Sequence, residues 1–167
     1  MKKLQVDNET FFSRVVQLLS EGRQVTIPVK GYSMLPFIRG ERDLVVLEKP
    51  GTLKVGDMVL FRSGGRYVLH RIVEIGGEGL RIQGDGVLRG EERCTPDAVA
   101  GKVIRILRGG RRPVDPETPF QQWRSRTWRA LRPYRRPLLL AWRLLPWNFW
   151  IFLQQHKGKH AKEIQTT

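Results

Sequence analysis

The stretch from Met58 to Ile75, MVLFRSGGRYVLHRIVEI, contains two strand-like segments separated by a glycine turn. Met58–Arg62 is a short apolar run, and Arg66–Ile75 continues the chain beyond the turn. Ser63-Gly64-Gly65 lies between them, and glycines at such a point supply the positive φ angles that tight hairpin turns require. The stretch therefore predicts a β-hairpin.

Further strand-like segments lie on both sides of this hairpin. Before it, Gln24–Lys30 alternates between apolar and polar residues, and Leu44–Leu47 is a short apolar run typical of a buried strand. After it, a second glycine turn leads into Leu80–Gln83, and Val99–Leu107 is the last clear strand. Five or six short strands with glycine turns predict a mainly β, compact and mostly antiparallel domain over residues 24–108.

Helical segments are expected on both sides of the β domain. Asn8 followed by an apolar stripe predicts a capped amphipathic helix within residues 1–23. Residues 109–119 have the glycine and proline content of a linker. Apolar residues then recur at steps of three and four, which predicts a basic, aromatic helical appendage over 120–155, kinked or divided by its prolines. Residues 156–167 form a polar tail.

The positive charge of the chain is concentrated near its C-terminal end. The 167 residues carry 30 Lys and Arg against 16 Asp and Glu, a net charge of +14. Residues 102–143 hold 12 basic and 2 acidic side chains, whereas residues 1–101 hold 15 and 13. A nearly neutral body with a basic appendage is not the pattern of a uniformly basic nucleic-acid binder.

All five tryptophans of the chain lie between residues 123 and 150, within this basic region and just after it. Arginines interleaved with aromatic rings suit the boundary of an anionic membrane, so we expect residues 123–153 to contact such a surface. A helix packed across the β domain is a second interpretation, and nucleic-acid binding through phosphates and stacked bases is a less favoured third. Pro137–Leu153 contains Arg143 and Asn148 and falls short of a spanning segment, although spanning stays an alternative.

Cysteine content and the N-terminal residues narrow the possible classes of protein and their cellular location. Cys94 is the only cysteine, which rules out an internal disulfide framework and a cysteine-rich zinc site. Residues 1–8 lack the apolar stretch of a secretory signal. Together with the arginine-rich stretch before Leu138, this predicts a location on the cytoplasmic side, peripheral to the membrane. The sequence indicates no metal or cofactor and gives no oligomeric state.

Four short motifs contain residue types used in hydrolysis. Ser33 lies in GYSMLP, His70 in LHRI, Asp85 in GDG and Asp57 in GDMV. A serine hydroxyl becomes a good nucleophile when a neighbour accepts its proton, and histidine titrates near neutral pH. Each residue also has a plain structural interpretation as a loop serine, a core histidine or a turn-forming aspartate.

In this order the motifs resemble those of the signal peptidase and LexA-like serine peptidase superfamily. The matching blocks are GYSMLP at 31–36, GDMV at 56–59, LHRI at 69–72, GDG at 84–86 and AGKV at 100–103. The superfamily usually has a lysine where this chain has His70. A histidine there is similar to the endoplasmic-reticulum and archaeal type of signal peptidase. The resemblance implies a signal-peptidase/LexA-like β domain and a serine endopeptidase acting on a peptide or protein.

The resemblance also implies roles for individual residues. Ser33 would be the nucleophile, with its own backbone N–H as an oxyanion donor, and His70 would be the general base. A third residue should fix the tautomer of the imidazole, and Asp85 is the first candidate. The chain departs from the family after the GD turn, so Glu91, or Glu92 beside it, is the alternative.

Two other functions stay open at this point. A LexA-like regulator would cleave itself or a partner, although the lysine is missing and the N-terminal segment is too short for a helix-turn-helix domain and a linker. A non-catalytic module could keep the fold and bind a peptide or a membrane, in which case Ser33 would have no chemical role.

Overall fold

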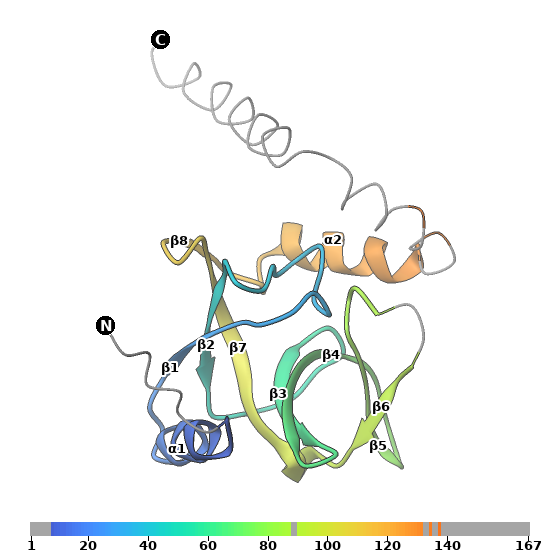
Figure 1. Cartoon of the computed structure of the whole chain (residues 1–167). Helices are drawn as coiled ribbons and strands as arrows, with labels where there is room; N and C mark the ends of the chain where they lie inside the picture. Colours follow the sequence, from blue (N-terminus) through green and yellow to red (C-terminus); the bar gives the residue numbers. More distant parts are fainter. Residues whose placement is uncertain (1–7, 88–89, 132–133, 135–136, 138–167) are drawn as a thin grey trace. The chain divides into compact units, whose positions relative to one another are not determined.

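The computed structural model describes residues 8–87, 90–131, 134 and 137. The chain separates into two units, Met1–Arg132 and Pro133–Thr167, and the fold described here is that of the first. Its elements are α1 (Asn8–Ser20), β1 (Val25–Pro28), β2 (Leu44–Glu48), β3 (Met58–Ser63), β4 (Arg66–Gly76), β5 (Gly79–Gln83), β6 (Glu92–Cys94), the 3-10 helix η1 (Pro96–Ala98), β7 (Val99–Arg108), β8 (Arg112–Val114) and α2 (Pro119–Ala130). The prediction of a mainly β, antiparallel architecture is confirmed (Figure 1).

One curled sheet contains all eight strands. Its order is β1-β2-β7-β3-β4-β5-β6, and every pairing is antiparallel. β8 pairs with the end of β7, beyond the part of β7 that pairs with β3. The expected hairpin is β3–β4, closed by the pair Ser63 and Arg66. Gly64 and Gly65 have φ angles of 55° and 80° in its turn, which explains the two glycines.

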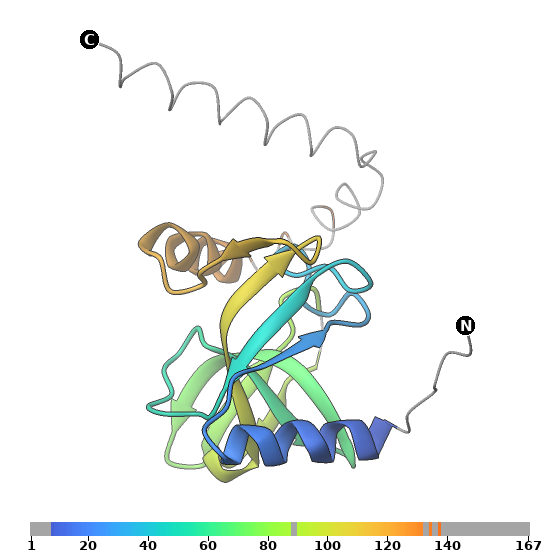
Figure 2. The ribbon, with the colours of Figure 1, turned by 90° about the vertical axis from the view of Figure 1, so that its left-hand side faces the viewer.

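Two apolar clusters form the core. The first joins α1, β1, β2, β3, β7 and the loop after β1, and the second lies among β3, β4, β5 and the start of β7. Leu19 of α1 approaches β7 so closely that a Cβ at Gly101 would lie 2.9 Å from its Cδ1. Figures 1 and 2 show α1 and α2 at opposite ends of the sheet. α2 contacts the first cluster through Trp128.

Three segments differ from the expectations. β6 was not expected, because Glu92–Cys94 has no apolar alternation, and its pairing with β5 makes it a strand. The linker expected over 109–119 contains β8 and the start of α2. The appendage expected over 120–155 begins as α2, a 12-residue helix. Residues 138–155 of that appendage and the polar tail over 156–167 lie outside the described residues.

Candidate active site

Ser33 lies on the loop between β1 and β2. The loop begins at Gly31, whose φ of 75° suits glycine, and it closes where the N–H of Gly40 donates to the Gly31 carbonyl at 3.1 Å. Buried apolar side chains after the serine anchor the loop in the first cluster: Met34, Phe37 and Ile38. Ser33 itself is only partly buried. The apolar residues therefore hold the loop while the serine stays accessible.

His70 lies on β4, opposite Val59 of β3, and its side chain is 11% exposed. Its Nδ1 is 3.3 Å from Oε2 of Glu92, the first residue of β6. Within the described ranges neither atom makes a hydrogen bond of good geometry, so short-range charge is what links them. A carboxylate in this position favours the tautomer with its hydrogen on Nδ1 and leaves the Nε2 lone pair free.

The surroundings of His70 favour its neutral form. Burial lowers the pKa of His70 below the ordinary 6.5, and the negative charges of Glu92 and then Asp85 oppose that shift only in part. A neutral imidazole is the form that accepts a proton from a hydroxyl. At neutral pH the ring is therefore in the state that a general base requires.

The serine loop, the histidine and the GDG turn meet at Gly84. The N–H of Gly86 donates to the carbonyl of Ser33 at 2.7 Å, which ties the turn to the serine loop. A Cβ at Gly84 would lie 2.6 Å from the same carbonyl oxygen and 3.0 Å from Nε2 of His70. The backbone carbonyl of Ser33 and Nε2 of His70 thus both lie close to Gly84, and the glycine keeps the space beside them free of side-chain atoms.

Asp85, the first candidate for the orienting acid, faces Arg71 instead. Nε of Arg71 donates to both carboxylate oxygens at 2.9 and 3.1 Å, and Nη2 donates to Oδ2 at 2.8 Å. His70 and Arg71 are neighbours on β4, so their side chains point to opposite faces of the strand. The carboxylate of Asp85 is therefore paired with the Arg71 guanidinium, and the structure does not place it to orient the imidazole.

Glu92, and not Glu91, lies beside the histidine. Glu91 instead has its Oε2 3.3 Å from Nε of Arg81. Successive side chains of an extended chain point in opposite directions, so only one of the two glutamates can face His70. The sequence could name the pair but could not choose between its members, because the choice depends on β6 and on its register with β5.

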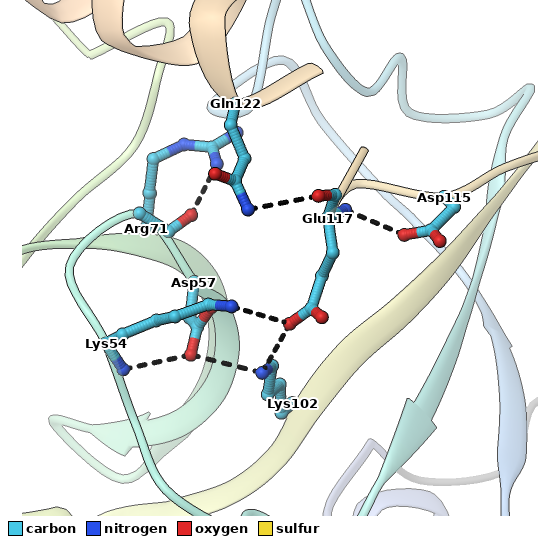
Figure 3. Close-up of polar contacts among 8 residues, drawn as sticks. Lys54, Asp57, Arg71, Lys102, Asp115, Glu117 and Gln122 are labelled. Carbon is cyan, nitrogen blue, oxygen red and sulfur yellow. Dashed lines mark hydrogen bonds and ion pairs between the residues drawn. The ribbon is translucent and has the colours of Figure 1, made fainter. Parts of the chain in front are cut away.

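Asp57 of the GDMV motif belongs to a separate polar cluster (Figure 3). Its Oδ2 accepts from the backbone N–H of Lys54 at 3.0 Å and lies 3.3 Å from Nζ of Lys102. Both lysines also contact Glu117, at 3.2 Å from Lys54 and 2.8 Å from Lys102. Asp57 thus holds the turn before β3, and Lys102 connects it to the segment that precedes α2.

Potential metal ligands, the cysteine and the described helices each bear on the class of protein beside the candidate site. In the part of the chain that the structure describes, no three His, Cys, Asp or Glu side chains gather in a way that could hold a metal ion. Burial raises the pKa of the half-buried Cys94 thiol, as suits a packing residue. Among the described helices, none is long and apolar enough to cross a membrane.

Comparison with known proteins gives no relative. No protein-family model matches the chain, and no curated protein matches it.

Proposed function

We propose that the protein is a serine endopeptidase of the signal-peptidase-like type, with Ser33 as nucleophile and His70 as general base. The observation that carries this proposal is that the backbone carbonyl of Ser33 and Nε2 of His70 both lie close to Gly84, which brings the serine loop next to the imidazole. The Glu92 carboxylate near Nδ1 supports it, since a serine–histidine site needs an acid on the far side of the ring. Glu92 is accordingly the third residue of the proposed site.

The proposed reaction is an acyl transfer in two steps. Oγ of Ser33 attacks the carbonyl carbon of a peptide bond while Nε2 of His70 accepts the hydroxyl proton. The C–N bond then breaks, and His70 returns that proton to the leaving amine. Water, deprotonated by His70, then attacks the ester carbonyl of the acyl-enzyme. The bond between the acyl carbon and Oγ breaks, and His70 returns the proton to Oγ, which restores Ser33. Glu92 stabilises the imidazolium formed in each step, and the backbone N–H of Ser33 donates to the oxyanion.

The arrangement of the motif blocks supports the finer assignment of the fold. The serine loop precedes β2, the histidine lies on β4, and the GDG turn follows β5. AGKV lies on β7, which pairs with both β2 and β3. Blocks that are distant in the sequence thus belong to one sheet and its loops, as a signal-peptidase/LexA-like domain would require.

Mass spectrometry of protein N-termini tests the proposal. Cells expressing the full chain are compared with cells expressing Ser33→Ala, His70→Ala or Ser13→Ala. Ser13 is an exposed serine of α1, so its variant controls for the loss of a hydroxyl away from the site. New N-termini should occur with the wild type and Ser13→Ala and be absent from the other two. Their flanking residues would give the substrate class.

The same experiment separates the competing functions. A self-cleaving regulator would give new termini from this chain itself, present with wild type and lost in Ser33→Ala. A non-catalytic module would give the same termini in all four strains, with the variants folded and equally abundant. That last outcome would contradict the proposed peptidase.

A further inference from the structure

A cleft separate from Ser33 and His70 lies between α2 and the turn before β3. It has a volume of about 140 Å³ and is lined by the turn residues Lys54–Asp57, by Arg71 and by one face of α2. The α2 residues are polar and follow the i, i+3, i+4, i+7 spacing of a single helix face: Gln122, Ser125, Arg126 and Arg129. A helix that turns such a face toward the body of the protein suggests a polar occupant for the cleft.

The acidic side chains around the cleft are already paired with lysines. Glu117 contacts Lys54 and Lys102, and Asp57 contacts Lys102 (Figure 3). Arg71 is likewise balanced by its buried pair with Asp85. These groups together therefore contribute little net charge to the cleft.

Arg126 and Arg129 add positive charge to the cleft without an acidic partner. Over residues 8–87 and 90–131, no carboxylate lies within ion-pair distance of either guanidinium. Burial, and after it the nearby charge of Arg71, lowers the pKa of Arg129, and the negative charge of Asp85 compensates this cation only in part. An anion bound in the cleft would add the missing negative charge beside this guanidinium.

Two buried donors that line the cleft lack hydrogen-bond partners. Ser125 is 6% exposed, and its Oγ makes no hydrogen bond in the described part of the protein. The same holds for Nε of Arg129, one helical turn further along. Buried polar atoms are normally paired, and leaving one unpaired destabilises the folded state. The two orphaned donors therefore indicate a ligand with several acceptor oxygens.

We propose that this cleft binds a phosphoryl group, with oxygens accepting from Oγ of Ser125 and from the guanidinium groups of Arg129 and Arg126. A phosphate monoester carries between about one and a half and two negative charges near pH 7 and has three terminal oxygens, which match two guanidiniums and a hydroxyl. Arginine also binds phosphate through paired N–H groups. The phosphoryl group belongs either to a small phosphate monoester in solution or to the headgroup of a lipid such as phosphatidic acid.

Calorimetric titration of the full chain with inorganic phosphate, at constant ionic strength, tests the site. The variants are Arg129→Gln, Arg129→Lys and Ser125→Ala, with Arg66→Gln as the control because Arg66 is exposed at the β3–β4 turn. We expect saturable binding, weakened about tenfold or more in Arg129→Gln, since hydrogen bonds to charged groups carry energies of that size. Arg129→Lys keeps the charge and should lose less, and Arg66→Gln should match the wild type.

Two results would overturn the proposal. One is the absence of saturable binding at millimolar phosphate. The other is binding of equal strength in the wild type and in Arg129→Gln, with both folded by circular dichroism, because the phosphate would then bind to basic residues elsewhere. Ser125→Ala provides a variant that removes a single hydroxyl from α2 if Arg129→Gln fails to fold.

Vesicles distinguish the two sources of the phosphoryl group. Phosphatidylcholine vesicles containing phosphatidic acid are compared with vesicles containing phosphatidylglycerol at the same surface charge, so that general attraction to the basic residues is common to both. A preference for phosphatidic acid that disappears in Arg129→Gln supports the site with a lipid as its source. Saturable phosphate binding without that preference supports the site with a soluble monoester as its source.

Discussion

Arg71 holds Asp85 through three hydrogen-bond contacts of 2.8 to 3.1 Å, although the two side chains are only 5% and 3% exposed. Nη1 of Arg71 also donates to the Gly56 carbonyl at 2.6 Å, and Nε1 of Trp128 donates to the backbone carbonyl of Asp85 at 2.8 Å. The Arg71–Asp85 pair therefore links β4, the turn before β3 and α2. This separates a structural acid, Asp85, from the acid next to the histidine, Glu92.

Asp85→Asn should destabilise the protein, because it leaves the buried Arg71 without its counter-charge. Breaking one side of a buried ion pair costs about 3–5 kcal/mol in the free energy of unfolding. Urea denaturation of the full chain measures this change. Glu92→Gln should cost less than about 1 kcal/mol, because its side chain is 36% exposed, yet it should lower kcat/KM. If Asp85→Asn lowered kcat/KM with little loss of stability, and Glu92→Gln left kcat/KM unchanged, Asp85 would be the residue that orients the imidazole.

The pH dependence of hydrolysis should reflect His70. Burial lowers the pKa of His70 below 6.5, so the acidic limb of the kcat/KM profile should have its midpoint below that pH. Glu92 raises the pKa of His70, so Glu92→Gln should move the limb to still lower pH while reducing the plateau. A limb that stays in place in Glu92→Gln would show that another group titrates.

The free energy of unfolding should also depend on pH through the lowered pKa of His70. The unfolded chain binds a proton at His70 near pH 6.5, whereas the folded chain binds it only at lower pH. Between these values the unfolded state holds more protons, so the free energy of unfolding falls as the pH drops below about 6.5. Urea denaturation at several pH values should show this decline in the wild type and a smaller one in His70→Gln. Equal declines would contradict the shift.

Gly84→Ala should damage both the fold and the site. The new methyl group would lie 2.6 Å from the Ser33 carbonyl oxygen and 2.7 Å from Cγ2 of Val87, so the serine loop would have to move. Overpacking of this kind costs about 1–3 kcal/mol. Gly77→Ala is the matched control, because its Cβ would meet nothing within 4 Å. Thermal unfolding compares the two, and equal melting temperatures would argue against close packing at Gly84.

The hairpin and most of the sheet could be predicted from the sequence because their signals are local. Apolar runs bounded by glycine pairs determine β3, β4 and β5 almost independently of the rest of the chain. β6 and β8 could not be predicted in this way. Each is a three-residue strand without apolar alternation, and each exists through pairing with a longer neighbour.

The candidate site shows the same difference between residues with a local sequence signal and residues placed by strand pairing. Ser33 and His70 are marked by motifs of their own, so the sequence could place them, and the fold then brings their segments to Gly84. The choice among Asp85, Glu91 and Glu92 depends on which face of β4 each acid meets. That is a property of strand register, and the sequence contains no local signal for it.

The most direct test of the peptidase is hydrolysis of a peptide library by the purified full chain. Wild type, Ser33→Ala and Ser13→Ala are incubated with the library at matched concentration, and the products are identified by mass spectrometry. The proposed mechanism predicts the same set of cleavages for wild type and Ser13→Ala and none for Ser33→Ala, whose fold should be unchanged. Cleavage that persists in Ser33→Ala, or equal absence of cleavage in all three folded proteins, would contradict it.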